Sequence, residues 1–195
     1  RGSIPWTHGR TNLHWGNGRI VFLSYHDGWP HLYSVPENGG EVVQLTEGRF
    51  MNEYISMSAD GNWLVSAANT GPQATDVDRR HLLKIAVDGS STEVITPGDG
   101  LEWGAVFTGN GQHIAFISAT AQRPPMPAVM PFGGGETRLL AMKTLPADYP
   151  RNSLMVPEQV VFEAPDGLKI HATKFERKDI EGQNPAIVYI HGGPP

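Results

Sequence analysis

The sequence lacks cysteine altogether, which excludes disulfide bonds and thiolate metal sites and leaves the cellular compartment open. Positive charge is also scarce, because 15 Lys and Arg residues stand against 20 Asp and Glu residues and the formal net charge is −5. A chain without a basic surplus is a poor match for phosphates, so we expect no nucleic acid partner. No apolar run reaches the roughly 18 residues that a membrane-spanning helix needs, so we expect no membrane partner.

What the sequence does contain is a core-forming composition interrupted by many turns. Apolar residues make up 39% and charged residues 18%, values that suit a folded chain rather than a disordered tail. There are 23 glycines and 16 prolines among the 195 residues. Because both residues break helices, this abundance predicts short elements joined by frequent turns.

A repeat of about fifty residues fills the first three quarters of the chain. The turn residues Gly18, Gly61 and Gly111 are 43 and 50 residues apart, and Thr46 and Thr96 are 50 apart. Asn-Gly or Asp-Gly between apolar runs is a strong hairpin signal, since a tight turn needs positive φ. We expect strands over 13–15, 20–23, 32–35, 42–46, 54–57, 63–65, 82–87, 93–96, 103–107 and 114–117, followed by a rigid proline-rich loop over 123–127.

Four short strands per unit at this period are typical of a β-propeller blade. The recurring glycines and β-branched runs leave no room for helices of ten or more residues. A β-sandwich with irregular hairpins is the competing interpretation, and we prefer the propeller. Three blades do not close a ring, because propellers use about four to eight, so further blades are expected in a longer parent protein.

The last forty residues change character. Residues 160–164 and 168–175 flank Asp166-Gly167 and predict an antiparallel hairpin with one buried and one solvated face. The apolar run 186–190 predicts a central strand covered on both faces. His191, Gly192 and Gly193 follow at its carboxyl end, where ligands of open α/β sheets gather. Glycine there lets backbone N–H groups approach a developing oxyanion, although an ordinary tight turn is the alternative.

These residues resemble a known family. Segments such as Ser58–Val65 and Gly39–Thr46 look like TolB-like propeller blades, a resemblance that covers roughly residues 11–145. The tail from Pro157 to Ala172, followed by residues 184–195, is similar to the junction between propeller and α/β-hydrolase domain in the prolyl-oligopeptidase family of serine peptidases. Its His-Gly-Gly-Pro form resembles the acylaminoacyl-peptidase and dipeptidyl-aminopeptidase-like members.

The resemblance implies a mainly β chain with two parts. Residues 1–155 are expected to be the C-terminal blades of a partial β-propeller of about three four-stranded blades, and residues 156–195 the first strands of an α/β-hydrolase sheet. The backbone N–H near Gly193 is expected to donate to the tetrahedral intermediate, while His191 shapes the loop or packs the turn. The substrate is expected to be a short peptide. No metal or organic cofactor is implied, and a periplasmic or secreted location is preferred to a cytoplasmic one.

The sequence contains no Gly-x-Ser-x-Gly nucleophile motif. In this family the Ser, Asp and His of the triad follow the oxyanion loop, so they are expected beyond Pro195. The chain alone is therefore expected to be inactive, and the rest of the parent chain is needed to complete both domains. Two alternatives stay open: a non-catalytic propeller that binds peptides or proteins, and an esterase or amidase on the same hydrolase fold.

Other candidate sites are given structural interpretations. The eight histidines show no metal-binding pair and are expected to be hydrogen-bonded or solvated. Residues 76–80, Asp-Val-Asp-Arg-Arg, are interpreted as a solvated charge cluster. Trp63 and Trp103 lie at strand positions and are expected to pack in the core. Glu47 and Glu53 are isolated, so the pair of glutamates that binds a substrate amine in some dipeptidyl-peptidase relatives is not found here.

Overall fold

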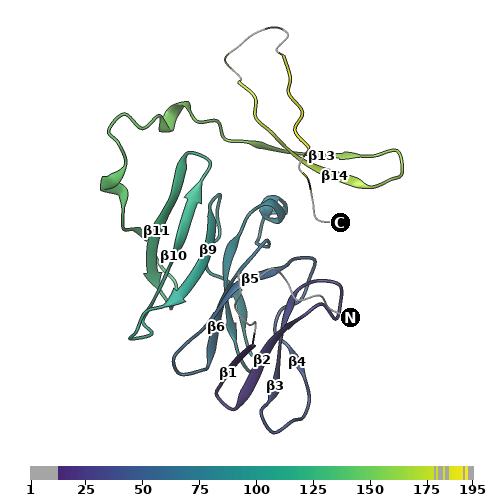
Figure 1. The fold of residues 1–195 in the computed structure, drawn as a ribbon, viewed down its shortest axis with the longest axis vertical. Helices are drawn as coiled ribbons and strands as arrows, with labels where there is room; N and C mark the ends of the chain where they lie inside the picture. The colour runs from purple at the N-terminus through teal and green to yellow at the C-terminus, as the bar shows by residue number, and fades with distance from the viewer. Residues whose placement is uncertain (1–12, 178, 180–181, 183–184, 191, 193–195) are drawn as a thin grey trace. The chain divides into compact units, whose positions relative to one another are not determined.

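The chain divides into two compact units, Arg1–Arg151 and Asn152–Pro195. In the first unit the described residues form three sheets of four strands each, and in the second they form one sheet of two strands (Figure 1). The architecture is mainly β, as the repeat predicts. The computed structural model describes residues 13–177, 179, 182, 185–190 and 192.

Each four-stranded sheet is an antiparallel meander whose strands follow chain order. Such units, repeated along the chain, are propeller blades, so the predicted partial propeller is confirmed. The first blade contains β1 (Leu13–Gly16), β2 (Arg19–Ser24), β3 (His31–Pro36) and β4 (Val43–Gln44). The second contains β5 (Asn52–Met57), β6 (Trp63–Ala68), β7 (His81–Ala86) and β8 (Thr92–Val94). The third contains β9 (Leu101–Phe107), β10 (His113–Thr120), β11 (Arg123–Pro131) and β12 (Arg138–Leu139).

The predicted glycine turns join the first and second strand of every blade. Gly18, Gly61 and Gly111 have φ values of 68°, 70° and 68°. Asn17, which precedes Gly18, also has a positive φ of 49°, a conformation that asparagine tolerates better than most residues. These left-handed positions are the reason that glycine recurs at the turns.

Gly61 has a second constraint, because its turn touches the turn of the first blade. A Cβ atom on Gly61 would lie 2.6 Å from Gly16 Cα and 2.7 Å from the backbone nitrogen of Asn17. The two turns are also joined by a hydrogen bond of 2.6 Å from Asn17 Nδ2 to Asn62 Oδ1.

We expect Gly61→Ala to lower the free energy of unfolding by about 3 kcal/mol, because the left-handed backbone and the contact with the first blade both oppose a side chain. Gly111→Ala is the matched control. Gly111 has nearly the same φ, and an added Cβ would meet nothing within 4 Å. It should therefore cost only about 1–2 kcal/mol for the backbone. Urea unfolding measures both, and equal losses would contradict the proposed contact between blades.

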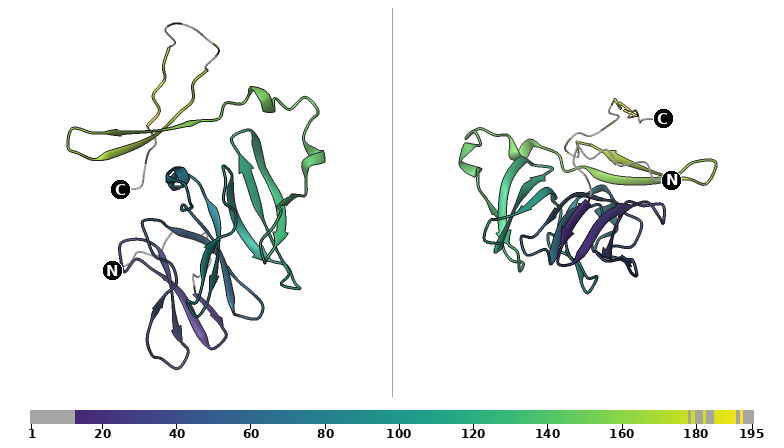
Figure 2. Two further views of the ribbon diagram at one scale, coloured as in Figure 1. Left: turned by 180° about the vertical axis from the view of Figure 1, so that it is seen from behind. Right: turned by 60° about the horizontal axis from the view of Figure 1, so that its bottom comes forward.

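The sheets of neighbouring blades lie side by side (Figure 2), and two clusters of apolar side chains join them. One cluster joins the first and second blades, and the other joins the second and third. Leu64 and Val65 are neighbours in β6 and enter different clusters, because successive side chains of a strand point to opposite faces. Both are fully buried. The second blade is thus covered on both faces.

The third blade corrects one prediction. Residues 123–127, expected as a proline-rich loop, form the first part of β11. Pro127 lies opposite Ile117 of β10, and its carbonyl accepts a hydrogen bond from the Leu140 nitrogen at 2.9 Å. In an antiparallel strand the nitrogen and carbonyl of one residue face the same neighbour, so the missing N–H of Pro127 faces away from β10. The ladder to β10 loses nothing there, which is why the strand accepts this proline.

The second unit contains the predicted hairpin, with β13 (Glu158–Glu163) paired to β14 (Lys169–Lys174) around the turn at Gly167. The expected buried face is wrong, because Phe162 is 52% and Ile170 38% exposed. A two-stranded ribbon buries a face only when another layer packs on it. Short 3₁₀ helices complete the described chain: η1 (Ala74–Asp78), η2 (Met142–Thr144) and η3 (Arg151–Ser153).

The structure forms no strand over residues 185–190, where the sequence predicts a central strand. Ile187, Val188, Tyr189 and Ile190 are each at least 85% exposed. A central strand needs a partner on each edge and a layer on each face, and the described residues supply none of these to this segment. The predicted hydrolase sheet therefore stays a prediction.

Candidate functional site

The predicted oxyanion loop falls largely outside the described residues. His191 and Gly193 are not described, and Gly192 is exposed and outside any strand. The structure therefore neither brings these three residues together nor separates them, and their role stays a prediction.

The structure reveals a buried polar site that occurs twice, with a spacing of fifty residues. Each copy begins with a histidine at the start of a blade's third strand, His31 in β3 and His81 in β7, and both side chains are fully buried. The next residue donates its backbone N–H to a threonine hydroxyl. Leu32 donates to Thr46 at 3.0 Å, and Leu82 donates to Thr96 at 2.8 Å.

The first copy is built mainly of neutral groups. His31 Nε2 lies 2.8 Å from the Gly48 carbonyl, which can only accept, so this nitrogen carries a proton. His31 Nδ1 lies 3.0 Å from Thr46 Oγ1, and Asn52 Nδ2 donates to the same hydroxyl at 2.9 Å. The nearest carboxylate, on partly exposed Asp27, lies 3.7 Å from Nε2.

The second copy places carboxylates on both sides of the histidine. His81 Nδ1 lies 3.4 Å from Glu102 Oε2, and Nε2 lies 3.2 Å from Asp76 Oδ1. The Asp76 contact has an ion-pair distance without hydrogen-bond geometry. Burial works to lower the pKa of His81, but its interactions with Glu102 and Asp76 outweigh burial and raise the pKa above its ordinary value.

Glu102 stands fifty residues after Asn52, so a carboxylate in the second copy takes the place of an amide in the first. Ser66 Oγ donates to Asn52 Oδ1 at 3.0 Å, and Ser118 Oγ donates to Glu102 Oε1 at 3.2 Å. Arg123 adds a cation beside the second copy through a 2.9 Å hydrogen bond from Nη2 to Ser118 Oγ. Exchange of one amide for a carboxylate thus accompanies the change from a neutral to a charged site.

Asp76 corrects the prediction of a solvated cluster, because it is only 1% exposed. Its Oδ2 accepts from the Gln73 backbone nitrogen at 2.8 Å, and its Oδ1 accepts from Arg79 Nη1 at 3.0 Å. Burial raises the pKa of Asp76, but these hydrogen bonds and the neighbouring His81 outweigh burial and hold the pKa below its ordinary value. The sequence did not indicate this burial, because a run of charged residues is typical of a solvated loop. Asp76 becomes buried only because η1 folds the loop back over the start of β7.

A third feature lies on the first strands of the second and third blades. In β5, Tyr54 and Ile55 together oppose a single residue of β6, and in β9 Gly104 and Ala105 oppose a single residue of β10. These are β-bulges whose first residue is left-handed, with φ of 54° at Tyr54 and 64° at Gly104. Next to the first bulge, Glu53 forms an ion pair with Arg80.

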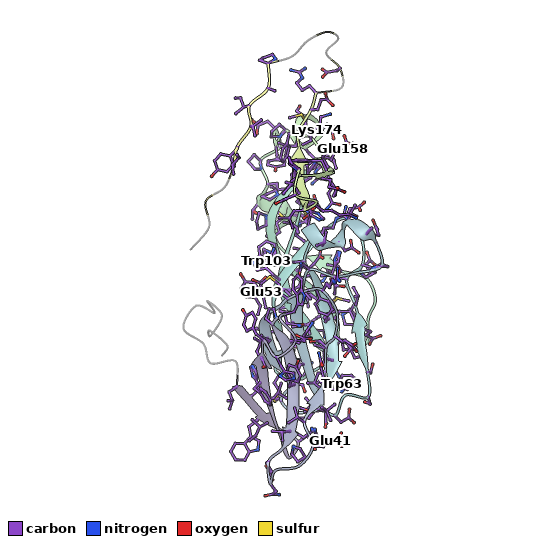
Figure 3. All side chains as sticks on the ribbon, turned by 90° about the vertical axis from the view of Figure 1, so that its right-hand side faces the viewer. Glu41, Glu53, Trp63, Trp103, Glu158 and Lys174 are labelled. Atoms are coloured by element: carbon purple, nitrogen blue, oxygen red, sulfur yellow. The ribbon has the colours of Figure 1, made fainter. Side chains whose placement is uncertain are left out.

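β5 and β9 lie side by side, as the labels of Glu53 and Trp103 indicate in Figure 3. Trp103 is partly buried against the cluster between the second and third blades. Trp63 packs edge-on against Phe132, with ring centroids 5.7 Å apart. The predicted core role of both tryptophans is therefore confirmed. The ammonium of Lys84 lies 4.7 Å from the Trp63 ring centroid, a cation–π contact.

Within the part of the chain that the structure describes, no group of three or more His, Asp or Glu side chains is arranged to hold a metal ion. In the same residues, no helix is long and apolar enough to cross a membrane.

The blades match a known family. A sequence model of the dipeptidyl peptidase IV (DPP IV) N-terminal region matches residues 4–125, which is more than half of the chain. The chain belongs to this family. The predicted resemblance to peptidases of the prolyl-oligopeptidase family is thereby confirmed, and the blades correspond to their N-terminal propeller.

Solved structures share the fold at low sequence identity. A putative TolB from Agrobacterium tumefaciens has a TM-score of 0.51 and 23% identity over 65% of this chain and 47% of that chain. A puromycin-hydrolyzing peptidase from Mycobacterium tuberculosis has a TM-score of 0.64 and 15% identity over 83% of this chain and 25% of that one. Dipeptidyl peptidase 4 of Porphyromonas gingivalis has a TM-score of 0.63 and 18% identity over 83% and 23%. The chain thus spans about a quarter of the length of the two peptidases.

Proposed function

We propose that this chain is the propeller part of a serine peptidase that hydrolyses short peptides through an acyl-enzyme. The observation that carries the proposal is the match of residues 4–125 to the N-terminal region of dipeptidyl peptidase IV, a range that contains the strands of the first two blades and the first two strands of the third. Two of the similar structures are described as a puromycin-hydrolyzing peptidase and a dipeptidyl peptidase, which favours amide over ester substrates.

In this proposal the chemistry is divided between the chain and the rest of its protein. His191, Gly192 and Gly193 form the loop whose backbone N–H groups stabilise the oxyanion of the tetrahedral intermediate. The serine nucleophile, its histidine base and the orienting aspartate are supplied beyond Pro195, because the chain contains no nucleophile elbow. The blades limit which peptides reach the reacting groups.

The whole protein that contains this chain should hydrolyse chromogenic aminoacyl and dipeptidyl anilides and react with a fluorophosphonate probe for active serines. The isolated 195-residue chain should do neither, because an oxyanion loop without a nucleophile does not carry out acyl transfer. Amide and ester substrates of the same acyl group, measured side by side, distinguish a peptidase from an esterase.

Turnover by the isolated chain would refute the placement of the triad outside it. A whole protein that neither turns over peptides nor reacts with the probe would refute the peptidase proposal. Peptide binding by that inactive protein would instead support a non-catalytic binding module.

A further inference from the structure

Tyr54 occupies a backbone conformation that its repeat partner fills with glycine. Both residues begin a bulge on the first strand of a blade, and both are left-handed. Glycine adopts this conformation without cost, whereas a residue with a Cβ loses roughly 1–2 kcal/mol. The second blade therefore has a strained tyrosine at the position where the third blade has glycine.

Packing does not account for this tyrosine, because its side chain is 40% exposed. It belongs to neither apolar cluster between the blades, whereas the next residue, Ile55, packs against the first cluster. Strained residues that are kept without a packing role gather at binding and catalytic positions. Tyr54 is thus a candidate for contact with a ligand.

The position of Tyr54 points to the channel of the propeller. The second and third blades approach one another most closely along their first strands, β5 and β9. Because blades are arranged radially around a central channel, the strands that approach most closely are those beside the axis. Glu53, the residue before Tyr54, forms a partly exposed ion pair with Arg80. This ion pair adds a polar part to the same wall. An aromatic ring beside a polar pair is a surface that suits a peptide.

We propose that Tyr54 is a specificity-determining residue on the channel wall, where its ring packs against a part of the peptide substrate remote from the scissile bond. This inference rests on the proposed peptidase function. Contact with a remote part of the substrate strengthens binding only when the peptide is long enough to reach it. The residue therefore selects peptides by length and by the presence of an apolar side chain at that point.

The test uses the whole protein with Tyr54→Gly, Tyr54→Asn and Tyr54→Phe. Glycine and asparagine both suit the left-handed backbone and remove the ring, whereas phenylalanine keeps the ring. Two substrates are compared: a dipeptidyl anilide and a quenched fluorescent octapeptide with apolar side chains. The ratio of kcat/KM for the octapeptide to that for the anilide should fall about tenfold in the glycine and asparagine variants, mainly through KM. The phenylalanine variant should restore most of the ratio.

Thermal unfolding supplies the second readout, because Tyr54→Gly should raise Tm by relieving the strained backbone. Val42→Gly is the control, since Val42 is 50% exposed and lies outside the channel-side strands. It should leave the kcat/KM ratio unchanged.

An unchanged ratio in the glycine and asparagine variants would overturn the inference while leaving the peptidase proposal intact. A lower Tm in Tyr54→Gly would make Tyr54 a packing residue and would also overturn it. A wild-type protein that cleaves neither substrate would refute the peptidase proposal itself.

Discussion

Replacing Gly193 by proline is expected to lower kcat of the whole peptidase by about 10²–10³, because removal of one oxyanion donor typically has this effect. Proline lacks the backbone N–H that the proposed function assigns to the tetrahedral intermediate. The N–H acts mainly where charge develops on the carbonyl oxygen, so the loss should appear in kcat with little change in KM. Steady-state kinetics on a chromogenic dipeptide measures both constants.

Gly193→Ala is the matched variant, because alanine adds a Cβ at the same position and keeps the backbone N–H. It should retain most of the activity, and circular dichroism should show all three proteins folded alike. Equal kcat values in the proline variant and the wild type would remove Gly193 from the oxyanion loop. Equal losses in the alanine and proline variants would assign the effect to loop shape instead.

His81→Leu should lower the free energy of unfolding by about 3–5 kcal/mol, because it leaves the buried carboxylates of Asp76 and Glu102 without the cation between them. His31→Leu is the matched change in the neutral copy of the site. There the substitution removes the ring nitrogen that faces the Thr46 hydroxyl and the side-chain donor to the Gly48 carbonyl, which costs about 1–3 kcal/mol. Urea unfolding at pH 6 compares the two, and an equal loss would contradict the charged character of the second copy.

The His81→Leu variant should also change the pH dependence of stability. The pKa of His81 is raised in the folded protein, so its contribution is fully present below the ordinary value of 6.5 and is lost as the pH rises through the raised value. The depressed pKa of Asp76 acts in the opposite direction, and its contribution is lost as the pH falls below the ordinary value of 3.8. Arg79 also pairs with Asp76 and with Asp99. His81→Leu should therefore flatten the decline in stability above pH 6.5.

The strands of the first two blades follow from local signals in the sequence. Glycines such as Gly18 and Gly61 mark the hairpin turns because few other residues accept their φ values, and alternating apolar residues mark the strands between them. β11 was not predicted because proline is a signal against strands, and only the arrangement of β10 and β12 shows that Pro127 loses no bond to β10.

The buried polar sites could be predicted only in part. The fifty-residue spacing of Thr46 and Thr96 is visible in the sequence, and the same spacing relates His31 to His81 and Asn52 to Glu102. What the sequence does not show is burial, because Asp76 becomes buried only when η1 returns over β7. The strain at Tyr54 is likewise not visible in the sequence alone. The glycine found fifty residues later, Gly104, hints that the position is left-handed, and the matching bulges in the two strands establish it.

The double-faced burial of the second blade has a consequence for biosynthesis. Leu64 and Ile85 are covered by the blade made before it, whereas Val65, Ala67 and Leu82 are covered by the blade made after it. A nascent chain that has emerged from the ribosome only as far as residue 100 therefore exposes one apolar face of the second blade's sheet. Nascent chains stalled at that length should recruit chaperones more strongly than chains stalled after residue 140, when β9 to β12 have emerged.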